Sequence, residues 1–280
     1  MKLSIITVNY NNFDGLKKTA ESILTQTWRD FEWIIIDGAS TDGSREYIVD
    51  LNESLNKNGW NPISYWCSEP DKGIYNAMNK GIFHAKGEYL NFMNSGDTFH
   101  ENTTLEKVIP FFAEALGDIY YGNANYIYKD HEEINAKPEK LSFEFIFRYT
   151  ISHQASFIRK ELLIQSEGYD ETLKIVSDWK MWLVWMMQKR KFIHIGLIVC
   201  DFDAYGISLT NDKMLYEERE KVYEDILPIG LRENMDKLHV YEKVTPYREH
   251  LFNYIIEHRY LKSVITLYLN ILSRIFNIKD

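Results

Sequence analysis

The chain has 280 residues, of which 45% are hydrophobic and 26% are charged, and this ordinary globular balance excludes a disordered or fibrous protein. The 32 Lys and Arg residues against 41 Asp and Glu residues give a formal net charge of −9, which argues against general nucleic-acid binding because that function requires a basic surface. The length allows one large or two small domains, with a core that needs no disulfides or structural metal.

The cysteine content and the hydropathy pattern indicate the cellular compartment of the protein. The two cysteines, Cys67 and Cys200, each lie in an apolar stretch, which is not the pattern of a disulfide framework. No apolar run approaches the roughly 20 residues of a membrane span, and the first residues do not resemble a secretory signal. We therefore expect a cytoplasmic protein, with peripheral contact at the inner face of the cell membrane as a further option.

Strand-like and helix-like segments alternate over the first 100 residues. Nearly continuous apolar runs predict buried strands at 3–8, 33–36, 63–67 and 89–93. Helical patterns fill the intervals, and they include 43–55 and 73–83. This β-α-β-α-β-α-β order predicts an α/β fold with a mostly parallel central sheet and helices on both faces.

The rhythm changes in the second part of the chain. We expect a helix near 105–116, antiparallel strands around 120–128, helices at 162–168 and 177–188, and a strand pair or hairpin at 191–202. Beyond residue 210 the sequence becomes helical and amphipathic. It therefore predicts one domain over 1–210 and a C-terminal helical extension over 211–280, which either docks on a protein surface or lies on a membrane.

Polar residues follow each of the first four predicted strands. The segments are 9–11, 37–43, 69–73 and 94–97, and all are rich in Asp, Asn, Ser or Gly. Turn chemistry explains any one of them, but not all four together. Ligands of open α/β sheets bind beyond the carboxyl ends of the strands. Carboxylates there repel phosphates unless a divalent cation bridges them, and they accept hydrogen bonds from a ribose or a uracil. The sequence thus predicts a nucleotide-sugar site with Mg²⁺ or Mn²⁺.

These same segments resemble a known family. The matching stretches are SIITVNYN (4–11), SILTQT (22–27), EWIIIDGASTDGS (32–44), EPDKGIYNAMNKG (69–81) and NSGD (94–97), followed more thinly by 153–154, 168–170 and 177–179. Together they resemble family 2 glycosyltransferases. The resemblance implies a GT-A fold, with a nucleotide-binding half over 1–100 and an acceptor-side half over 101–210, and inverting sugar transfer from a nucleoside diphosphate sugar.

The resemblance also implies roles for individual residues around the donor. Thr7, Asn9 and Tyr10 would line the base pocket, Asp37 would bind the uracil or ribose, and Asp71 and Lys72 would lie near the base and the nucleotide. His153 or Gln154 would hydrogen-bond the acceptor or the diphosphate, although an ordinary core role explains His153 equally well.

The metal motif departs from the family pattern. The family usually shows Asp-x-Asp-Asp, whereas here Asn94 and Gly96 replace two acidic positions and only Asp97 remains as an anionic ligand. One carboxylate with diphosphate oxygens and waters still suits Mg²⁺ or Mn²⁺, with weak affinity in the absence of substrate. Asn94 and Ser95 would then contact the donor, Asn94 through its amide oxygen.

Asp178 matches the position of the catalytic base. The alternative is that Asp178 has only a structural role, because the helix dipole favours an acidic residue in the first turn of a helix. The expected reaction is transfer of a hexose or N-acetylhexosamine from a UDP-sugar to a glycan or lipid-linked acceptor in surface-polysaccharide synthesis, by a protein that could form homo-oligomers. The alternatives are a sugar-phosphate nucleotidyltransferase and a nucleotide-sugar-binding protein without turnover.

Overall fold

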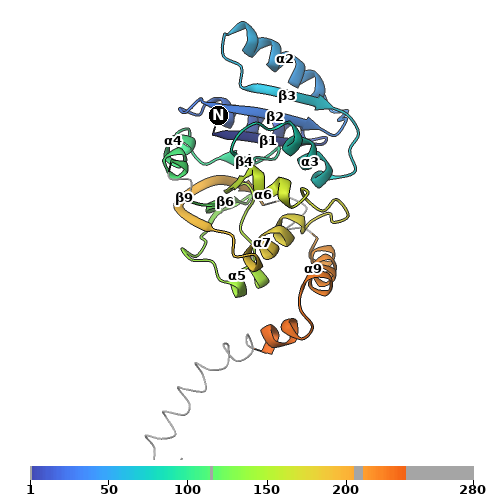
Figure 1. Cartoon of the computed structure of the whole chain (residues 1–280). Coiled ribbons are helices and arrows are strands. Elements are labelled where there is room, and N and C mark those ends of the chain that lie inside the picture. The colour runs from blue at the N-terminus through green and yellow to red at the C-terminus, as the bar shows by residue number, and fades with distance from the viewer. Residues whose placement is uncertain (1, 114–115, 205–210, 238–280) are drawn as a thin grey trace, which may run out of the picture. The chain divides into compact units, whose positions relative to one another are not determined.

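A computed structural model describes residues 2–113, 116–204 and 211–237 (Figure 1). Contacts divide the chain into two units, residues 1–222 and 223–280. Helix α9 (Asp212–Ile226) runs across this division, and in the second unit the Arg232 guanidinium lies 5.6 Å from the centre of the Tyr223 ring. The apolar stretch 247–278, expected to dock or to lie on a membrane, falls outside the described residues.

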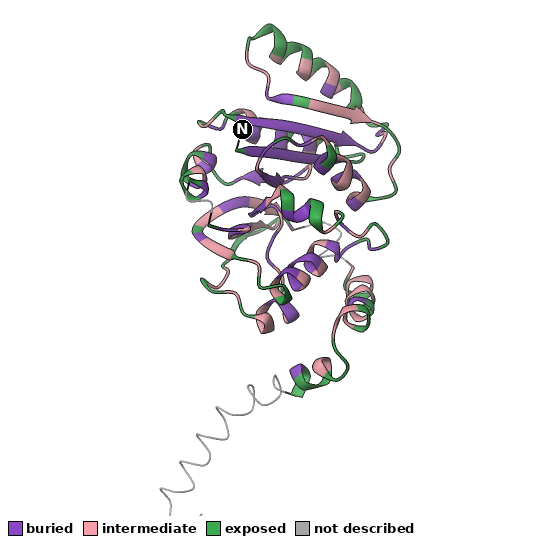
Figure 2. Cartoon of the chain, viewed as in Figure 1, coloured by how far each residue is buried: buried purple, intermediate pink, exposed green. Residues whose placement is uncertain are grey.

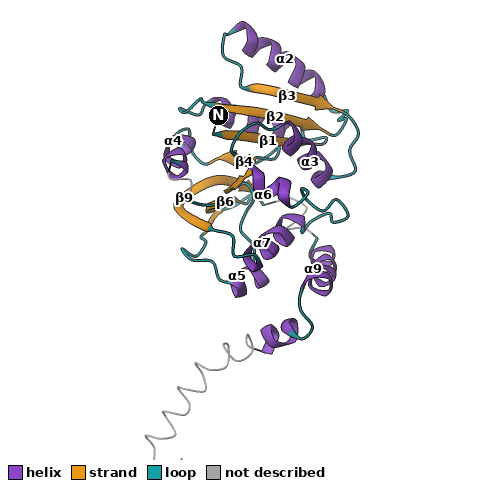
Figure 3. Ribbon diagram, viewed as in Figure 1, coloured by secondary structure: helices purple, strands orange, loops and turns teal. Residues whose placement is uncertain are grey.

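Four parallel strands form the first half of the sheet, in the spatial order β3-β2-β1-β4 (Figure 3). They are β1 (Leu3–Asn9), β2 (Phe31–Asp37), β3 (Ile63–Ser68) and β4 (Tyr89–Phe92), connected by α1 (Phe13–Leu24), α2 (Ser44–Lys57) and α3 (Ile74–His84). Every residue of β1 and β2 is buried, as their nearly continuous apolar runs predict (Figure 2). The expected parallel α/β half is therefore confirmed.

The second half of the sheet mixes strand directions. Beyond β4 come β8 (Ser156–Arg159), β6 (Ile119–Ile127), β9 (Phe192–Asp203) and β5 (Thr98–Phe99), while β7 (Glu132–Asn135) pairs with β6. Strand β8 is antiparallel to both of its neighbours, and β6 and β9 are parallel. The remaining helices are α4 (Thr104–Val108), the 3₁₀ helix η1 (Ile109–Phe112), α5 (Phe143–Arg148), α6 (Lys160–Gln165) and α7 (Ser177–Met187).

Two expected elements differ from the structure. The helix expected near 105–116 ends as α-helix at Val108 and continues as η1, because Pro110 has no N–H to donate to the helix. The hairpin expected at 191–202 is the single strand β9, in which Gly196 takes a φ of 69° and the pairing register with β6 shifts. The glycine allows a local irregularity within one strand rather than a reversal of the chain.

The part of the chain that the structure describes contains no helix that is both long enough and apolar enough to cross a membrane.

Candidate active site

The ends of β1, β2 and β3 are joined by one buried carboxylate. Asp37 is fully buried, and its oxygens accept hydrogen bonds from Asn9 Nδ2 (2.7 Å), from Ser40 Oγ (2.6 Å) and N (3.0 Å), and from Ser68 Oγ (2.6 Å). The sequence led us to expect that this carboxylate binds the uracil or ribose, but these protein donors already form hydrogen bonds with both of its oxygens. In this structure Asp37 positions Asn9 rather than lining the open space in front of it.

A cavity of about 740 Å³ lies in front of these strand ends. Asn9, Tyr10 and Asp71 line it, as expected for a base pocket, and Tyr10 is 68% exposed. Thr7 and Lys72 are not among its lining residues. The Thr7 hydroxyl is buried inside the sheet, where it accepts a 2.9 Å hydrogen bond from the Trp33 indole N–H.

Gly38 permits the close approach of two of these residues. A Cβ atom on Gly38 would lie 2.5 Å from Asp71 Oδ2 and 3.1 Å from the Tyr10 ring. A side chain at this position would therefore require the Asp71 carboxylate to move. The other oxygen of Asp71 accepts a 2.9 Å hydrogen bond from the Gly73 backbone N–H, which fixes the carboxylate at the rim of the cavity.

The turn after β4 is held by α1 and explains the unusual metal motif. Gly96 has a φ of 108°, which favours glycine over any acidic residue. The Thr19 hydroxyl accepts from the Gly96 N–H (3.0 Å) and donates to the Asp97 carbonyl (2.7 Å), and Asn12 Nδ2 donates to the Ser95 carbonyl (2.9 Å). The backbone of this turn is thus fixed before any ligand arrives.

A second cavity, of about 340 Å³, contains both of the carboxylates expected to carry the chemistry. Asp97 and Asp178 line it together with His153 and Gln154. It adjoins the larger cavity, because Asn12, Ile74, Asn94 and Ser95 line both. The structure therefore brings most of the residues singled out in the sequence to one continuous depression.

Asp97 is almost completely buried, with 5% of its surface exposed. Its Oδ2 accepts a 2.8 Å hydrogen bond from Gln154 Nε2, and its Oδ1 accepts a 3.1 Å hydrogen bond from the Asp203 backbone N–H. Burial raises the pKa of Asp97 to about 6, against the lowering effect of these hydrogen bonds. An approaching cation would relieve the cost of keeping this charge in a buried place.

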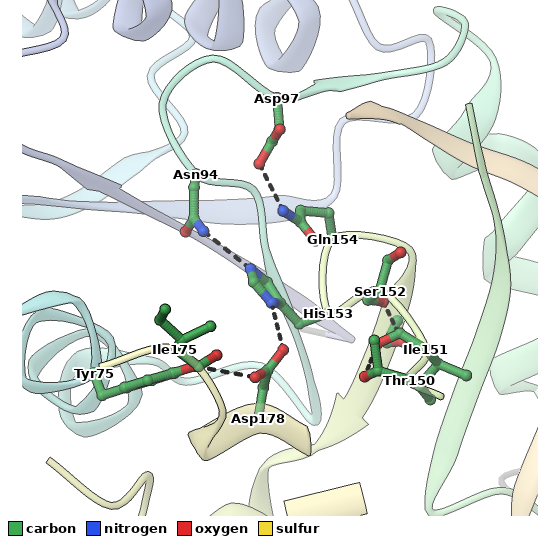
Figure 4. A network of polar contacts seen from close by, with 11 residues as sticks. Tyr75, Asn94, Asp97, Thr150, Ile151, Ser152, His153, Gln154, Ile175 and Asp178 are labelled. Carbon is green, nitrogen blue, oxygen red and sulfur yellow. Dashed lines mark hydrogen bonds and ion pairs between the residues drawn. The ribbon is translucent and has the colours of Figure 1, made fainter. Parts of the chain in front are cut away.

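Asp178 is the centre of a polar network on the opposite wall (Figure 4). Its Oδ2 lies 3.0 Å from His153 Nδ1, and its Oδ1 lies 3.0 Å from the Tyr75 hydroxyl. His153 Nε2 lies 3.0 Å from Asn94 Nδ2. Since the amide nitrogen of Asn94 donates, Nε2 accepts and a neutral His153 carries its proton on Nδ1, directed at Asp178.

The residues around Asp97 suit a hard divalent cation. Among the described residues, no group of three or more His, Cys, Asp or Glu side chains could hold a metal. However, Asn94 Oδ1 and Ser95 Oγ are buried without a hydrogen-bond partner, and the Asp203 side chain lines the same cavity. Oxygen atoms of this kind fit Mg²⁺ or Mn²⁺ once a diphosphate supplies the remaining ligands.

Sequence reasoning missed Asp203. Asp203 is the last residue of β9 and lines the cavity. Because we expected a hairpin in this region, we did not predict that the end of a strand would place a carboxylate there. Trp179, Trp182 and Trp185 of α7 are buried. Asp178 also occupies the first turn of α7, so its dipole role and its place in the cavity coexist.

Comparisons with known proteins agree with this architecture. A glycosyltransferase of Mycobacterium tuberculosis, itself uncharacterised, is 29% identical over 233 residues, which cover 81% of this chain and 82% of the relative. A PGL/p-HBAD biosynthesis glycosyltransferase of the same organism is 28% identical over 63% of this chain and 66% of its own length.

Solved structures show the same fold. TarS of S. aureus in complex with UDP-GlcNAc superposes with a TM-score of 0.62 at 18% identity, covering 82% of this chain and 68% of that protein. The mannosyltransferase PcManGT of Pyrobaculum calidifontis, in complex with GDP-Man and Mn²⁺, gives 0.60 at 13% identity, covering 99% and 88%. These neighbours confirm the expected GT-A fold.

The sequence model described as glycosyl transferase family 2 matches residues 4–175, which span both halves of the sheet and most of the residues of the two cavities. The chain is therefore a glycosyltransferase and belongs to glycosyl transferase family 2.

Proposed function

We propose that this enzyme transfers a hexose or N-acetylhexosamine, with inversion, from a UDP-sugar to a hydroxyl of a glycan or lipid-linked acceptor in surface-polysaccharide synthesis. One observation carries the proposal: Asp97 and Asp178 line the same 340 Å³ cavity. A site of that size brings the leaving group and the attacking hydroxyl together, with one carboxylate near each.

The larger cavity is the proposed nucleotide site. Tyr10 offers an exposed ring for stacking on a base, and Asn9 Oδ1 is buried without a hydrogen-bond partner. Asp71 presents a carboxylate to a base N–H or a ribose hydroxyl. The complexes of TarS with UDP and UDP-GlcNAc support uridine, while the complex of PcManGT with GDP-Man makes guanosine the competing base.

The smaller cavity is the proposed site of transfer. Trp179, Tyr126 and Phe202 contribute aromatic side chains to its wall, which suits the apolar face of a sugar ring. The relative named for PGL/p-HBAD biosynthesis supports an acceptor of a surface-glycan type, and the donor and acceptor classes stay part of the proposal.

Asp178 acts as general base in this proposal. Its carboxylate accepts the proton of the acceptor hydroxyl as that oxygen attacks the anomeric carbon and the bond to the diphosphate breaks. The Nδ1–H of His153 and the hydroxyl of Tyr75 orient the carboxylate. Asp97 and Asp203 would hold a divalent cation, which when bound supplies neutralisation of diphosphate charge.

The test uses Asp178→Asn, with Asp50→Asn on the exposed face of α2 as the matched control. UDP release is measured with a panel of UDP- and GDP-sugars, with Mn²⁺ and with EDTA. Asp178→Asn is expected to lose transfer by about 10³-fold while it binds UDP as tightly as the wild type. Normal transfer by this variant, or no turnover of any donor by the wild type, would refute the proposal.

A further inference from the structure

Glu218, on helix α9, binds the backbone just ahead of the proposed catalytic base. Its Oε1 accepts a 2.7 Å hydrogen bond from the Lys174 N–H. Its Oε2 accepts from the N–H groups of Ile175 (2.9 Å) and Val176 (3.2 Å). One carboxylate thus satisfies three successive backbone donors at the point where α7 begins, and hydrogen bonds to an ionised acceptor are the stronger kind.

This short segment is connected to Asp178 through a tyrosine from the other half of the molecule. The Tyr75 hydroxyl lies 2.6 Å from the Ile175 carbonyl oxygen and 3.0 Å from Asp178 Oδ1 (Figure 4). Burial raises the pKa of Tyr75 well above its ordinary value, so the hydroxyl keeps its proton. That single hydrogen is shared between the carbonyl and the carboxylate, and the place of Ile175 therefore sets the place of the hydroxyl.

The next residue of α9 reinforces the attachment. The Arg219 guanidinium lies 4.5 Å from the Trp179 ring centre, and its Nη1 donates a 2.7 Å hydrogen bond to the Arg148 carbonyl. Arg219 and Leu215 also line the 340 Å³ cavity. Helix α9 therefore forms part of the wall of this cavity as well as contacting its supporting backbone.

From these contacts we infer that Glu218 is a positioning residue for sugar transfer, which fixes residues 174–176 and, through Ile175 and Tyr75, the orientation of Asp178. The inference rests on the proposed function, since it assigns Asp178 as the base. It also makes α9, which lies beyond residues 4–175 matched by the family, a necessary part of the active site.

A measurement without turnover tests the structural step. In hydrogen–deuterium exchange of the full chain, Glu218→Ala is expected to accelerate exchange of the amides at 174–176 by at least about 10-fold. Glu217→Gln is the matched control, because Glu217 is the neighbouring acid, is exposed, and pairs only weakly with Lys213 at 3.8 Å. Unchanged protection of 174–176 in Glu218→Ala overturns the inference.

Kinetics test the catalytic step. Glu218→Ala is expected to lower kcat by about 10-fold or more. The KM for the donor is expected to stay within about twofold of wild type, because neither Glu218, Tyr75 nor residues 174–176 line the 740 Å³ nucleotide cavity. Glu218→Gln, which keeps one oxygen acceptor, is expected to fall between Ala and wild type. Glu217→Gln is expected to match the wild type.

A double-mutant cycle with Tyr75→Phe completes the test. If Glu218 acts through Tyr75, the double variant loses no more than the more damaged single variant. Additive losses, or faster exchange with an unchanged kcat, would overturn the inference and leave the proposed function standing. Wild-type transfer by Asp178→Asn would refute the proposed function itself, whatever the exchange data show.

Discussion

His153 holds Asp178 in place, with Nδ1 of the ring 3.0 Å from Oδ2 of the carboxylate. The next residue in the chain, Gln154, donates to Asp97 on the other wall. Two consecutive residues ahead of β8 therefore reach the two carboxylates of one cavity, so their separation is fixed by a single stretch of backbone. Such a link favours catalysis because it removes the need to organise both groups at the moment of reaction.

The first prediction concerns His153. His153→Ala removes the donor to Asp178 Oδ2 and leaves Asn94 without its partner. We expect kcat to fall by about 10²-fold, with little change in UDP affinity, because a misplaced base affects the attack rather than nucleotide binding. Steady-state kinetics and UDP titration provide the measurement. His131→Ala, at an exposed histidine, is the control. A wild-type kcat in His153→Ala would contradict the role of His153 in holding Asp178.

The second prediction concerns the cation. Gln154→Leu leaves Asp97 Oδ2 buried without its side-chain donor, so the carboxylate is held less firmly. We expect the Mn²⁺ concentration for half-maximal activity to rise by about 10-fold, the usual effect of losing an outer partner of a metal ligand. Gln165→Leu, on the exposed side of α6, serves as the control. An unchanged Mn²⁺ requirement, or full activity of the wild type in EDTA, would count against a cation at Asp97.

The sequence predicted β1, β2 and β4 well because these strands are buried along their whole length. The run from Trp33 to Ile36 has no polar interruption, and such a run suits the inside of a parallel sheet. The end of β9 was less predictable, because the region expected to form a strand pair or hairpin is one continuous strand that pairs with β6 and β5. Asp203 was missed for that reason.

The site was predicted in its residue types and less well in its contacts. Asp37 lies at the expected edge of the sheet. The Ser68 hydroxyl that donates a hydrogen bond to its carboxylate comes from another strand, and no local sequence pattern predicts this contact. Glu218 lies in a helix whose charged sequence is typical of a solvent-exposed helix. The three backbone N–H groups that it binds are more than 40 residues away in the chain. Both contacts depend on tertiary packing alone.

The third prediction concerns Gly38. In Gly38→Ala the new Cβ would lie 2.5 Å from Asp71 Oδ2, so the carboxylate must move. Asp71 is exposed enough to move without disturbing the core, so thermal stability should change little. We expect UDP affinity, measured by calorimetry, to fall by roughly 10-fold.

A second substitution shows whether that loss comes from Asp71. In an Asp71→Ala background the clash with Oδ2 no longer exists, and Gly38→Ala should then cost little further affinity. An equal loss in both backgrounds would mean that the methyl group acts on Tyr10 or on the ligand itself.

The fourth prediction concerns the attachment of α7, which carries Asp178. Lys180 Nζ lies 2.6 Å from Asp170 Oδ2, and the Thr172 hydroxyl and N–H both donate to Asp170 Oδ1. Burial alone would raise the pKa of Asp170, but these hydrogen bonds outweigh it and lower the pKa to about 2. We expect Asp170→Asn to reduce the free energy of unfolding by about 1–2 kcal/mol at pH 7, allowing for partial solvent screening.

The pH dependence identifies the carboxylate as the source of this stability. Because the folded pKa lies below the ordinary value of 3.8, the contribution of Asp170 is fully present above about pH 4 and is lost as the pH falls toward 2. In urea unfolding, the difference between wild type and Asp170→Asn should therefore be constant from pH 7 to 5 and shrink by pH 3. Glu53→Gln, which breaks an exposed 3.8 Å pair on α2, should cost less than about 0.5 kcal/mol. A difference for Asp170→Asn that persists undiminished at pH 3 would show that packing, and not the ionised carboxylate, holds α7 to this loop.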